Sequence, residues 1–143
     1  MLGLDLGDVR IGVAISDDRQ RMAVPLGTVR TGAPQDLKSI AALVRDNDVA
    51  LVVVGHPLSM SGHCGPRARA AEAFAGALRS FLDVPVVLHD ERLSTVEAER
   101  ALREAGLSGR ERRRVVDRQA AVVILQSYLD ASPGRRPADP PSA

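Results

Sequence analysis

Hydrophobic residues recur at every second position near the start of the chain. "MLGLDLG" (1–7) carries leucine in this pattern, and "RIGVAIS" (10–16) repeats it with isoleucine and valine. Such alternation is typical of a strand with one face in a core. The short joint between the two segments predicts a hairpin. "MAVPLGTVRT" (22–31) predicts a third, weaker strand, in which Pro25 suggests a sheet edge or a bulge.

The rest of the chain contains two continuous apolar runs and several segments with helical periodicity. "VALVVVG" (49–55) and "VPVVLHDE" (84–91) are rich in valine, as in parallel strands buried on both faces. The predicted helices cover 34–48, 66–82, 94–106 and about 114–131, and the predicted loops are 56–65 and an Arg-rich, mobile 107–113. This order, β-β-β-α-β-α-β-α-α, predicts an α/β fold with a mixed sheet and helices on its faces.

Length and composition predict one domain followed by a short tail. The chain has 143 residues, of which 45% are hydrophobic, which suits a single domain over 1–131. The segment 132–143 has four prolines in twelve residues, so we expect a disordered tail. The longest apolar run is too short to span a membrane, and we expect a soluble, cytoplasmic protein. The net charge of +1 neither favours nor excludes a nucleic-acid partner.

Asp117 is the first acidic residue that needs an explanation. Counting forward by three and four from Asp117 gives an apolar stripe of Ala120, Ala121, Ile124, Leu125 and Tyr128. A carboxylate at the head of a buried stripe needs a positive partner, because an unpaired buried charge costs several kcal/mol. That partner is either Arg113 or Arg114, one turn earlier, or a metal ion.

Two further acidic positions can reach the same point. On the first strand, Asp5 lies on the face opposite the leucines, together with Gly3 and Gly7, and glycine in a strand often marks a close approach. Asp90 and Glu91 follow the last strand and point to opposite sides if the strand continues. One of the two can therefore share the face of Asp5.

A set of carboxylates favours a hard cation. Oxygen ligands suit Mg²⁺ or Mn²⁺, and a pair of such ions can activate water and stabilise the leaving oxygen of a phosphodiester. The histidines His56, His63 and His89 lack the paired spacing of a zinc site. Cys64 is the only cysteine and is interpreted as a small loop residue.

Four segments together resemble a known family. They are "GLDLGDVRIGVAISD", "VVVGHPLSMSG", "HDERLSTVEA" and "VVDRQAAVVIL", and they resemble the YqgF/RuvX family of Holliday-junction resolvases and pre-16S ribosomal-RNA nucleases. The resemblance runs from about residue 2 to 130. It implies a ribonuclease H-like fold with sheet order 3-2-1-4-5. It also implies that Asp5, Glu91 and Asp117 are the catalytic, metal-binding acids, and that Asp90 either turns away from them or supports the metal ligands without touching the ion.

The loop "VGHPLSMSG" departs from the family pattern. An apolar residue is usual where this chain has His56, and asparagine is common where it has Ser59. His56 is then either a solvated loop residue or an added phosphate contact.

Arginines supply the candidate substrate contacts. Residues 108–118 hold five arginines against two acids. Basic residues are slightly unfavourable near a helix N-terminus, yet we expect three arginines of this segment to contact substrate phosphates. Two arginines from other parts of the chain are expected to lie nearer the metal. The nucleic-acid-binding candidates are thus Arg112, Arg113 and Arg114, with Arg10 and Arg92 beside the acids.

These features predict a Mg²⁺-dependent nuclease that acts on structured nucleic acid, with maturation of the 5′ end of pre-16S ribosomal RNA as its function. Either a monomer or a homodimer is compatible with this reading. A Holliday-junction resolvase is the first alternative, and it requires a two-fold dimer because it cuts symmetrically. An actin-like phosphotransferase fragment and a non-catalytic nucleic-acid-binding module are the others.

Overall fold

The structure is a computed structural model. It describes residues 1–58, 61–91 and 109–131, and the side chains of all these residues except 109–119. The predicted helix 94–106, the predicted tail 132–143, Arg92 and Ser59 lie outside the described residues.

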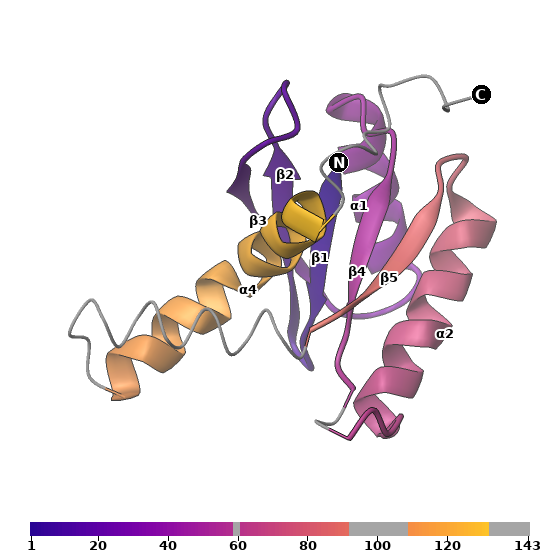
Figure 1. Ribbon diagram of the computed structural model, residues 1–143. Coiled ribbons are helices and arrows are strands. Elements are labelled where there is room, and N and C mark those ends of the chain that lie inside the picture. Colours follow the sequence, from indigo (N-terminus) through magenta and orange to yellow (C-terminus); the bar gives the residue numbers. More distant parts are fainter. Residues whose placement is uncertain (59–60, 92–108, 132–143) are drawn as a thin grey trace.

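Five strands form one mixed sheet at the centre of the molecule (Figure 1). The strands are β1 (Leu2–Leu6), β2 (Arg10–Ser16), β3 (Ala23–Arg30), β4 (Val52–His56) and β5 (Val86–Asp90). Their order is β3-β2-β1-β4-β5, with β1, β2 and β3 antiparallel and with β4 parallel to both β1 and β5. This confirms the expected fold, including the β1–β2 hairpin and the edge position of the proline-containing strand.

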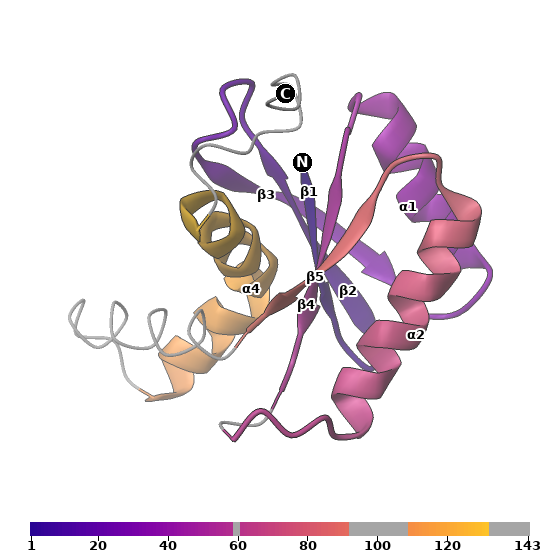
Figure 2. The ribbon, with the colours of Figure 1, turned by 45° about the vertical axis from the view of Figure 1, so that its right-hand side comes forward.

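Helices cover both faces of the sheet. Figure 2 shows α1 (Gln35–Asp46) and α2 (Pro66–Phe81) on one face and α4 (Gly109–Ala131) on the other. The period of two along each strand divides the core accordingly. Leu2, Leu4, Val52 and Val54 pack in the core on the side of α1 and α2. The smaller core under α4 contains Val53 together with Ala121, Ile124, Leu125 and Leu129.

Small residues lie where α4 packs against β1. A Cβ atom added at Gly3 of β1 would stand 2.7 Å from the Cβ of Leu125 and 3.1 Å from the backbone oxygen of Ala121. Only a residue without a side chain therefore allows α4 to lie this close to the sheet. Leu125 is fully buried and Ala121 nearly so, which agrees with the predicted apolar stripe.

Two predicted boundaries were wrong. We expected a mobile loop over 107–113, but α4 already begins at Gly109, because the arginines and Glu111 in this stretch are good helix formers despite their charge. His56 was expected in a loop and is instead the last residue of β4, paired with Asp90. Among the described helices, none combines enough length with enough apolar character to cross a membrane.

Candidate active site

Asp5 lies on the side of the sheet that faces α4. Its neighbours Leu4 and Leu6 belong to the core on the opposite side, so the alternation of the strand places Asp5 on the same side as Gly3. Across the hairpin its register partner is Gly12. A Cβ atom at Gly12 would stand 3.8 Å from the Cβ of Asp5 and 3.6 Å from that of Ala121. Asp5 therefore lies among small residues, next to the part of α4 that contains Ala121.

Glu91 reaches the same side from the end of β5. Its backbone N–H donates to the carbonyl of His56 at 3.2 Å, which continues the β4–β5 pairing by one step. Strand alternation places Glu91 on the face of Val87, which packs under α4, and places Asp90 on the other face. The choice between the two acids, open from their spacing alone, is thus resolved geometrically in favour of Glu91 as the neighbour of Asp5.

The two carboxyl groups influence each other directly. Burial of the side chain, reinforced by the nearby Asp5 carboxylate, raises the pKa of Glu91 to about 7. A hydrogen bond between the carboxyl groups of Asp5 and Glu91 raises this pKa as well, whereas the charge of Arg67 lowers it. Two carboxylates held together in a half-buried position repel each other when both are ionised. The arrangement therefore favours a bound cation.

A glycine makes room for Glu91. A Cβ atom at Gly55 of β4 would stand 2.9 Å from the Cδ and 3.1 Å from the Cγ of Glu91, and 2.6 Å from the Cδ1 of Ile124. The carboxyl group of Glu91 thus lies across the bare backbone of β4, next to α4. Any side chain at position 55 would push the carboxyl group out of this place.

A small cavity of about 80 Å³ opens beside Glu91. Its lining comes from the ends of β1 and β4, from the first turns of α2 and from Glu91. The lining residues are Leu6, Gly7, Asp8, Gly55, Pro57, Arg67, Ala70 and Glu91. It lies at the carboxyl ends of the parallel strands β1 and β4, where ligands of open α/β sheets usually bind.

Asp117 lies well inside α4, because the helix begins at Gly109 and not at about residue 114 as predicted. It is the ninth residue of the helix and precedes the buried Ala121 by one turn, so the two residues share a side of α4. Ala121 is the residue that approaches Gly12 next to Asp5. The side chain of Asp117 lies outside the described part of the structure, and its distance from Asp5 and Glu91 is therefore not assigned.

The predicted arginines are distributed over two regions. Arg10 is exposed at the start of β2, and it directly opposes Arg30 in the β2–β3 register. Like charges opposite each other are unfavourable, so this pair favours an anion. Arg112, Arg113 and Arg114 lie in the first half of α4, which extends away from the sheet (Figure 1).

Arg67 was missed from the sequence. It stands in the first turn of α2, directly after Pro66, and it lines the cavity. Proline is favoured at the first position of a helix, and this signal fixes where α2 begins. The proline does not indicate that the first turn of α2 faces the end of β5. That neighbourhood follows only from the assembled sheet.

His89 has a packing role. Its Nε2 atom lies 2.9 Å from the hydroxyl oxygen of Ser127, and its ring meets that of Tyr128 edge to face with centroids 5.7 Å apart. Burial lowers the pKa of His89, so a neutral ring is favoured at this position. The contacts connect β5 to the second half of α4 and account for the residue without a catalytic role.

The donor set fits a divalent oxygen-binding ion. Asp5 and Glu91 offer carboxylate oxygens in contact, without nitrogen or sulfur ligands among the described residues that line the cavity. Such ligands are preferred by Mg²⁺ and Mn²⁺. Burial and, after it, the adjacent Asp5 carboxylate raise the pKa of Glu91, and a cation between the two carboxyl groups would lower it.

Comparisons with known proteins point to one family. The sequence profile of the RuvX family, described as Holliday junction resolvase, matches residues 1–131. A relative from Anaeromyxobacter dehalogenans (strain 2CP-C), provisionally named pre-16S rRNA nuclease, is 52% identical over 130 residues that cover 90% of this chain and 95% of the relative. A relative of the same name from Geobacillus kaustophilus (strain HTA426) is 48% identical over 133 residues, with 91% and 96% covered.

One solved structure supports the fold. It is T. thermophilus RuvC in complex with a Holliday junction substrate, which aligns with a TM-score of 0.54 over 93% of this chain and 94% of that one. The sequence identity is 17%, so the likeness concerns the fold alone.

Proposed function

We propose, from the premise that the chain belongs to the RuvX family, that it is a metal-dependent nuclease that matures the 5′ end of precursor 16S ribosomal RNA. The family supports hydrolysis of nucleic acid, and an enzyme of this type implies the use of a divalent metal ion. The names of the relatives motivate the RNA substrate. The observation that carries the proposal is the contact between the carboxyl groups of Asp5 and Glu91 in a half-buried, glycine-lined position.

The catalytic acids in this proposal are Asp5, Glu91 and Asp117. Asp5 and Glu91 would hold Mg²⁺, or Mn²⁺ in its place, and Asp117 would complete the set from α4. Support for Asp117 comes from its position one turn before Ala121, on the side of the helix that packs against Gly12. A bound divalent ion supplies an activated water molecule and stabilises the charge that develops on the phosphodiester.

The protein itself contributes position and shielding. Gly55 leaves the Glu91 carboxyl group room above β4, and Gly12 does the same for Asp5 beside α4. Burial on the α4 side limits access of bulk water, and a low dielectric strengthens the interaction of the carboxylates with a cation. These residues act by holding the acids in place.

Phosphate groups of the substrate would meet arginines on two sides. Arg67 lines the cavity and Arg10 is exposed near the same end of the sheet. Arg112, Arg113 and Arg114 would contact the strand further along, on the projecting half of α4, and Arg92, like Arg10, would contact phosphate nearer the metal. Each phosphate contact that is lost should flatten the salt dependence of binding by about one unit of slope.

Resolution of branched DNA is the second candidate, favoured by the description of the family. Because a resolvase cuts two strands symmetrically, it acts as a two-fold dimer, whereas RNA maturation is compatible with a monomer. We place the domain at residues 1–131, the Pro-rich segment 132–143 outside it, and the protein in the cytoplasm, where ribosomal RNA is processed.

A side-by-side cleavage assay tests the proposal. A labelled precursor 16S RNA and a labelled four-way DNA junction are incubated with the protein in Mg²⁺, in Mn²⁺ and in EDTA. We expect cleavage of the RNA with either ion, none in EDTA and none by Asp5→Asn. Cleavage of the junction alone would replace the RNA by the second candidate. No cleavage of either substrate under any condition would refute the nuclease assignment.

A further inference from the structure

Three metal-ligating side chains converge next to the proposed nuclease site but on the other side of β4. They are His56, the last residue of β4, Cys64, just before α2, and Glu72, within α2. The Nε2 atom of His56 lies 3.3 Å from the Oε2 atom of Glu72, and the Sγ atom of Cys64 lies 3.2 Å from the same oxygen. All three ligand atoms lie within 4.8 Å of one another. We call these residues the His–Cys–Glu cluster.

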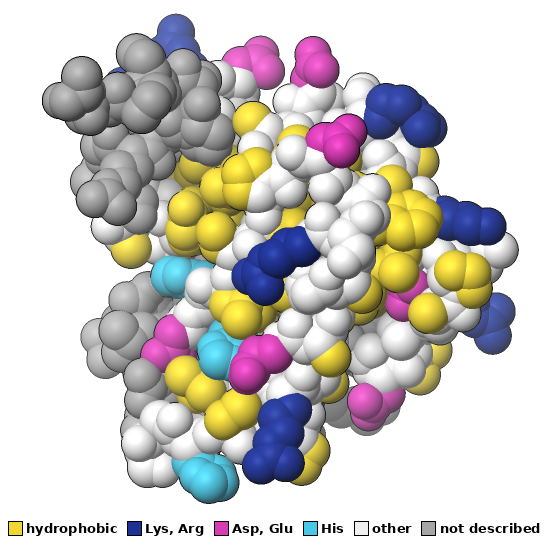
Figure 3. Space-filling model, turned by 90° about the vertical axis from the view of Figure 1, so that its right-hand side faces the viewer, with side chains coloured by type: hydrophobic (Ala, Val, Ile, Leu, Met, Phe, Trp, Pro, Cys, Tyr) yellow, Lys and Arg dark blue, Asp and Glu magenta, His cyan; other side chains and the backbone are white. Residues whose placement is uncertain are grey.

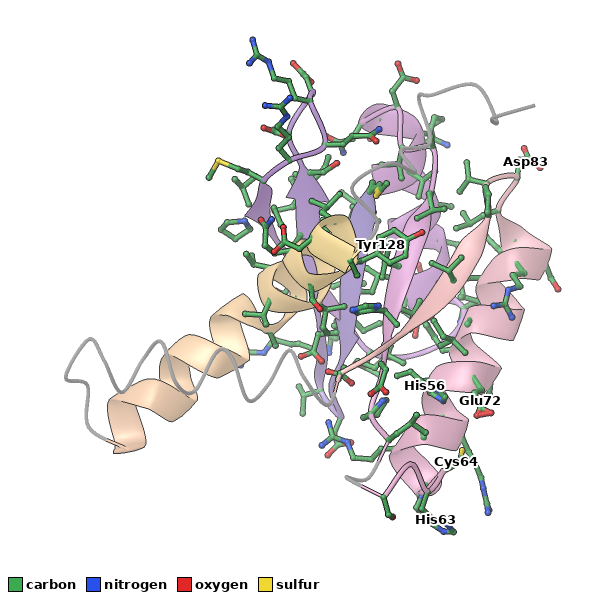
Figure 4. The ribbon with its side chains drawn as sticks, in the orientation of Figure 1. His56, His63, Cys64, Glu72, Asp83 and Tyr128 are labelled. Atoms are coloured by element: carbon green, nitrogen blue, oxygen red, sulfur yellow. The ribbon has the colours of Figure 1, made fainter. Side chains whose placement is uncertain are left out.

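The fold explains why these residues meet. Gly55 faces α4, so the next residue of the strand, His56, faces α2. On α2 the buried residues are Ala68, Ala71, Ala75 and Leu78. Glu72 follows Ala68 by one turn, at the margin of this buried side. Figure 4 shows the three side chains pointing toward one another at the N-terminal half of α2. On the face seen in Figure 3, histidine and acidic side chains lie next to one another at the surface.

The donor types are those of a zinc site. Imidazole nitrogen, thiolate sulfur and carboxylate oxygen all bind Zn²⁺, and sulfur and nitrogen together disfavour Mg²⁺. This set differs from the oxygen-only pair of Asp5 and Glu91. The two groups would therefore select different ions from the same solution.

The two distances to Glu72 are also close to those of a tetrahedral zinc site. With zinc–nitrogen and zinc–oxygen bonds of about 2.05 Å and a zinc–sulfur bond of about 2.3 Å, neighbouring ligand atoms stand about 3.4 Å (nitrogen–oxygen) and about 3.6 Å (sulfur–oxygen) apart. The observed 3.3 Å between His56 and Glu72 and 3.2 Å between Cys64 and Glu72 are near these values. Glu72 thus already stands at ligand distance from both partners.

We propose that the His–Cys–Glu cluster binds one Zn²⁺ ion, with a water molecule as the fourth ligand. In the metal-free protein the thiol of Cys64 donates its hydrogen bond to Glu72. On binding, the thiol releases its proton to solvent and the thiolate takes the metal, while Glu72 remains a carboxylate. The side chains of His56 and Glu72 are 19% and 44% exposed, so an ion can enter from solvent.

A zinc ion here would stabilise the framework around the acids. The carbonyl of His56 accepts the backbone N–H of Glu91, and Arg67, on the same helix as Glu72, lines the cavity next to Glu91. The ion would connect the end of β4 to α2 and so hold both walls of the cavity together. The proposal concerns metal binding only and does not depend on the proposed nuclease function.

The test is a zinc titration in the presence of excess Mg²⁺. The full-length protein is stripped of metal with EDTA and dialysed, and Zn²⁺ is added against a chromogenic chelator. We expect one tightly bound zinc ion per chain. Co²⁺ in place of Zn²⁺ should give a sulfur-to-cobalt charge-transfer band, which only the thiolate of Cys64 can supply because it is the single cysteine.

Variants of the cluster and two controls assign the ligands. Cys64→Ser should abolish the cobalt band, and His56→Ala and Glu72→Gln should each weaken zinc binding at least tenfold. His63→Ala, which removes a histidine next to Cys64 in the chain, and Asp5→Asn, which removes a nuclease-site acid, should bind zinc as the wild type does. Zinc should also raise the melting temperature of the wild type but not of Cys64→Ser.

Three results would overturn the proposal. They are the lack of stoichiometric zinc binding in excess Mg²⁺, unchanged binding by both Cys64→Ser and His56→Ala, or loss of zinc by Asp5→Asn with the cluster intact. The last result would show that zinc enters the nuclease site instead.

Discussion

Substitution of Gly55 by alanine tests how closely the acids are packed. The added Cβ atom would stand 2.9 Å from the Cδ of Glu91 and 2.6 Å from the Cδ1 of Ile124. Since carbon atoms in contact prefer about 3.5–4.0 Å, each of these groups must retreat by about 0.6–1.4 Å. Both are the outer parts of flexible side chains, so the backbone of β4 can stay in place.

The expected effect is larger on activity than on stability. Overpacking of this kind costs about 1–2 kcal/mol of the free energy of unfolding when side chains can adjust. A displacement of about 1 Å at a catalytic group can lower a rate about 100-fold. We therefore expect Gly55→Ala to lower the cleavage rate constant by about 10- to 100-fold in a protein that remains folded.

Urea unfolding and cleavage under saturating Mg²⁺ measure the two effects. Gly76→Ala is the matched control, because Gly76 lies in α2 and a Cβ atom there meets nothing within 4 Å. It should stabilise the protein by about 0.5–1 kcal/mol and leave cleavage unchanged. Wild-type cleavage by Gly55→Ala, or a loss that only follows the unfolded fraction, would refute the reasoning.

Three further predictions concern packing and charge. Leu125→Ala should lower the free energy of unfolding by about 2–5 kcal/mol, because the side chain is fully buried against Gly3; a loss below 1 kcal/mol in urea unfolding would contradict this. The pKa of Glu91 is raised to about 7, so near neutral pH the folded state retains a proton that the unfolded state releases. The metal-free protein should therefore lose stability as the pH rises from about 5 to about 8, by about 2 kcal/mol after allowance for the partial exposure of Glu91. Urea unfolding in EDTA that is flat over this range would exclude it, and Mg²⁺ should reverse the loss. Arg67→Ala should raise the pKa of Glu91 further, measured by NMR titration of its carboxyl carbon in EDTA, since the guanidinium charge lowers that pKa; a lower value would show that the charge acts elsewhere.

The hydrophobic pattern was sufficient for the sheet but not for every site residue. Alternation placed Asp5 opposite the leucines of β1, and the structure agrees. It could not choose between Asp90 and Glu91, because β5 is apolar on both faces and its period does not say which face meets α4. Only the packing of Val87 under α4, together with the contact of Glu91 with Asp5, decides this.

The start of α4 and the His–Cys–Glu cluster were not predictable from local patterns. The density of charge at 107–113 resembled a loop, although arginine and glutamate are compatible with a helix. The cluster joins residues from the end of a strand, a loop and a helix, so no short spacing rule identifies it. Its only sequence signal is His56 itself, which stands where the family usually has an apolar residue.

Manganese binding followed by NMR tests the central claim most directly, namely that Asp5 and Glu91 share a divalent ion. Paramagnetic Mn²⁺ should broaden the amide signals of Asp5, Gly12 and Glu91 at low stoichiometry. The exposed turn at Asp17 is the control and should keep sharp amide signals. In this turn the backbone N–H of Arg21 donates a hydrogen bond to the carboxylate of Asp17. Asp5→Asn should abolish the selective broadening. Equal broadening in the wild type and in Asp5→Asn, or none near Asp5 and Glu91 in the wild type, would contradict the account.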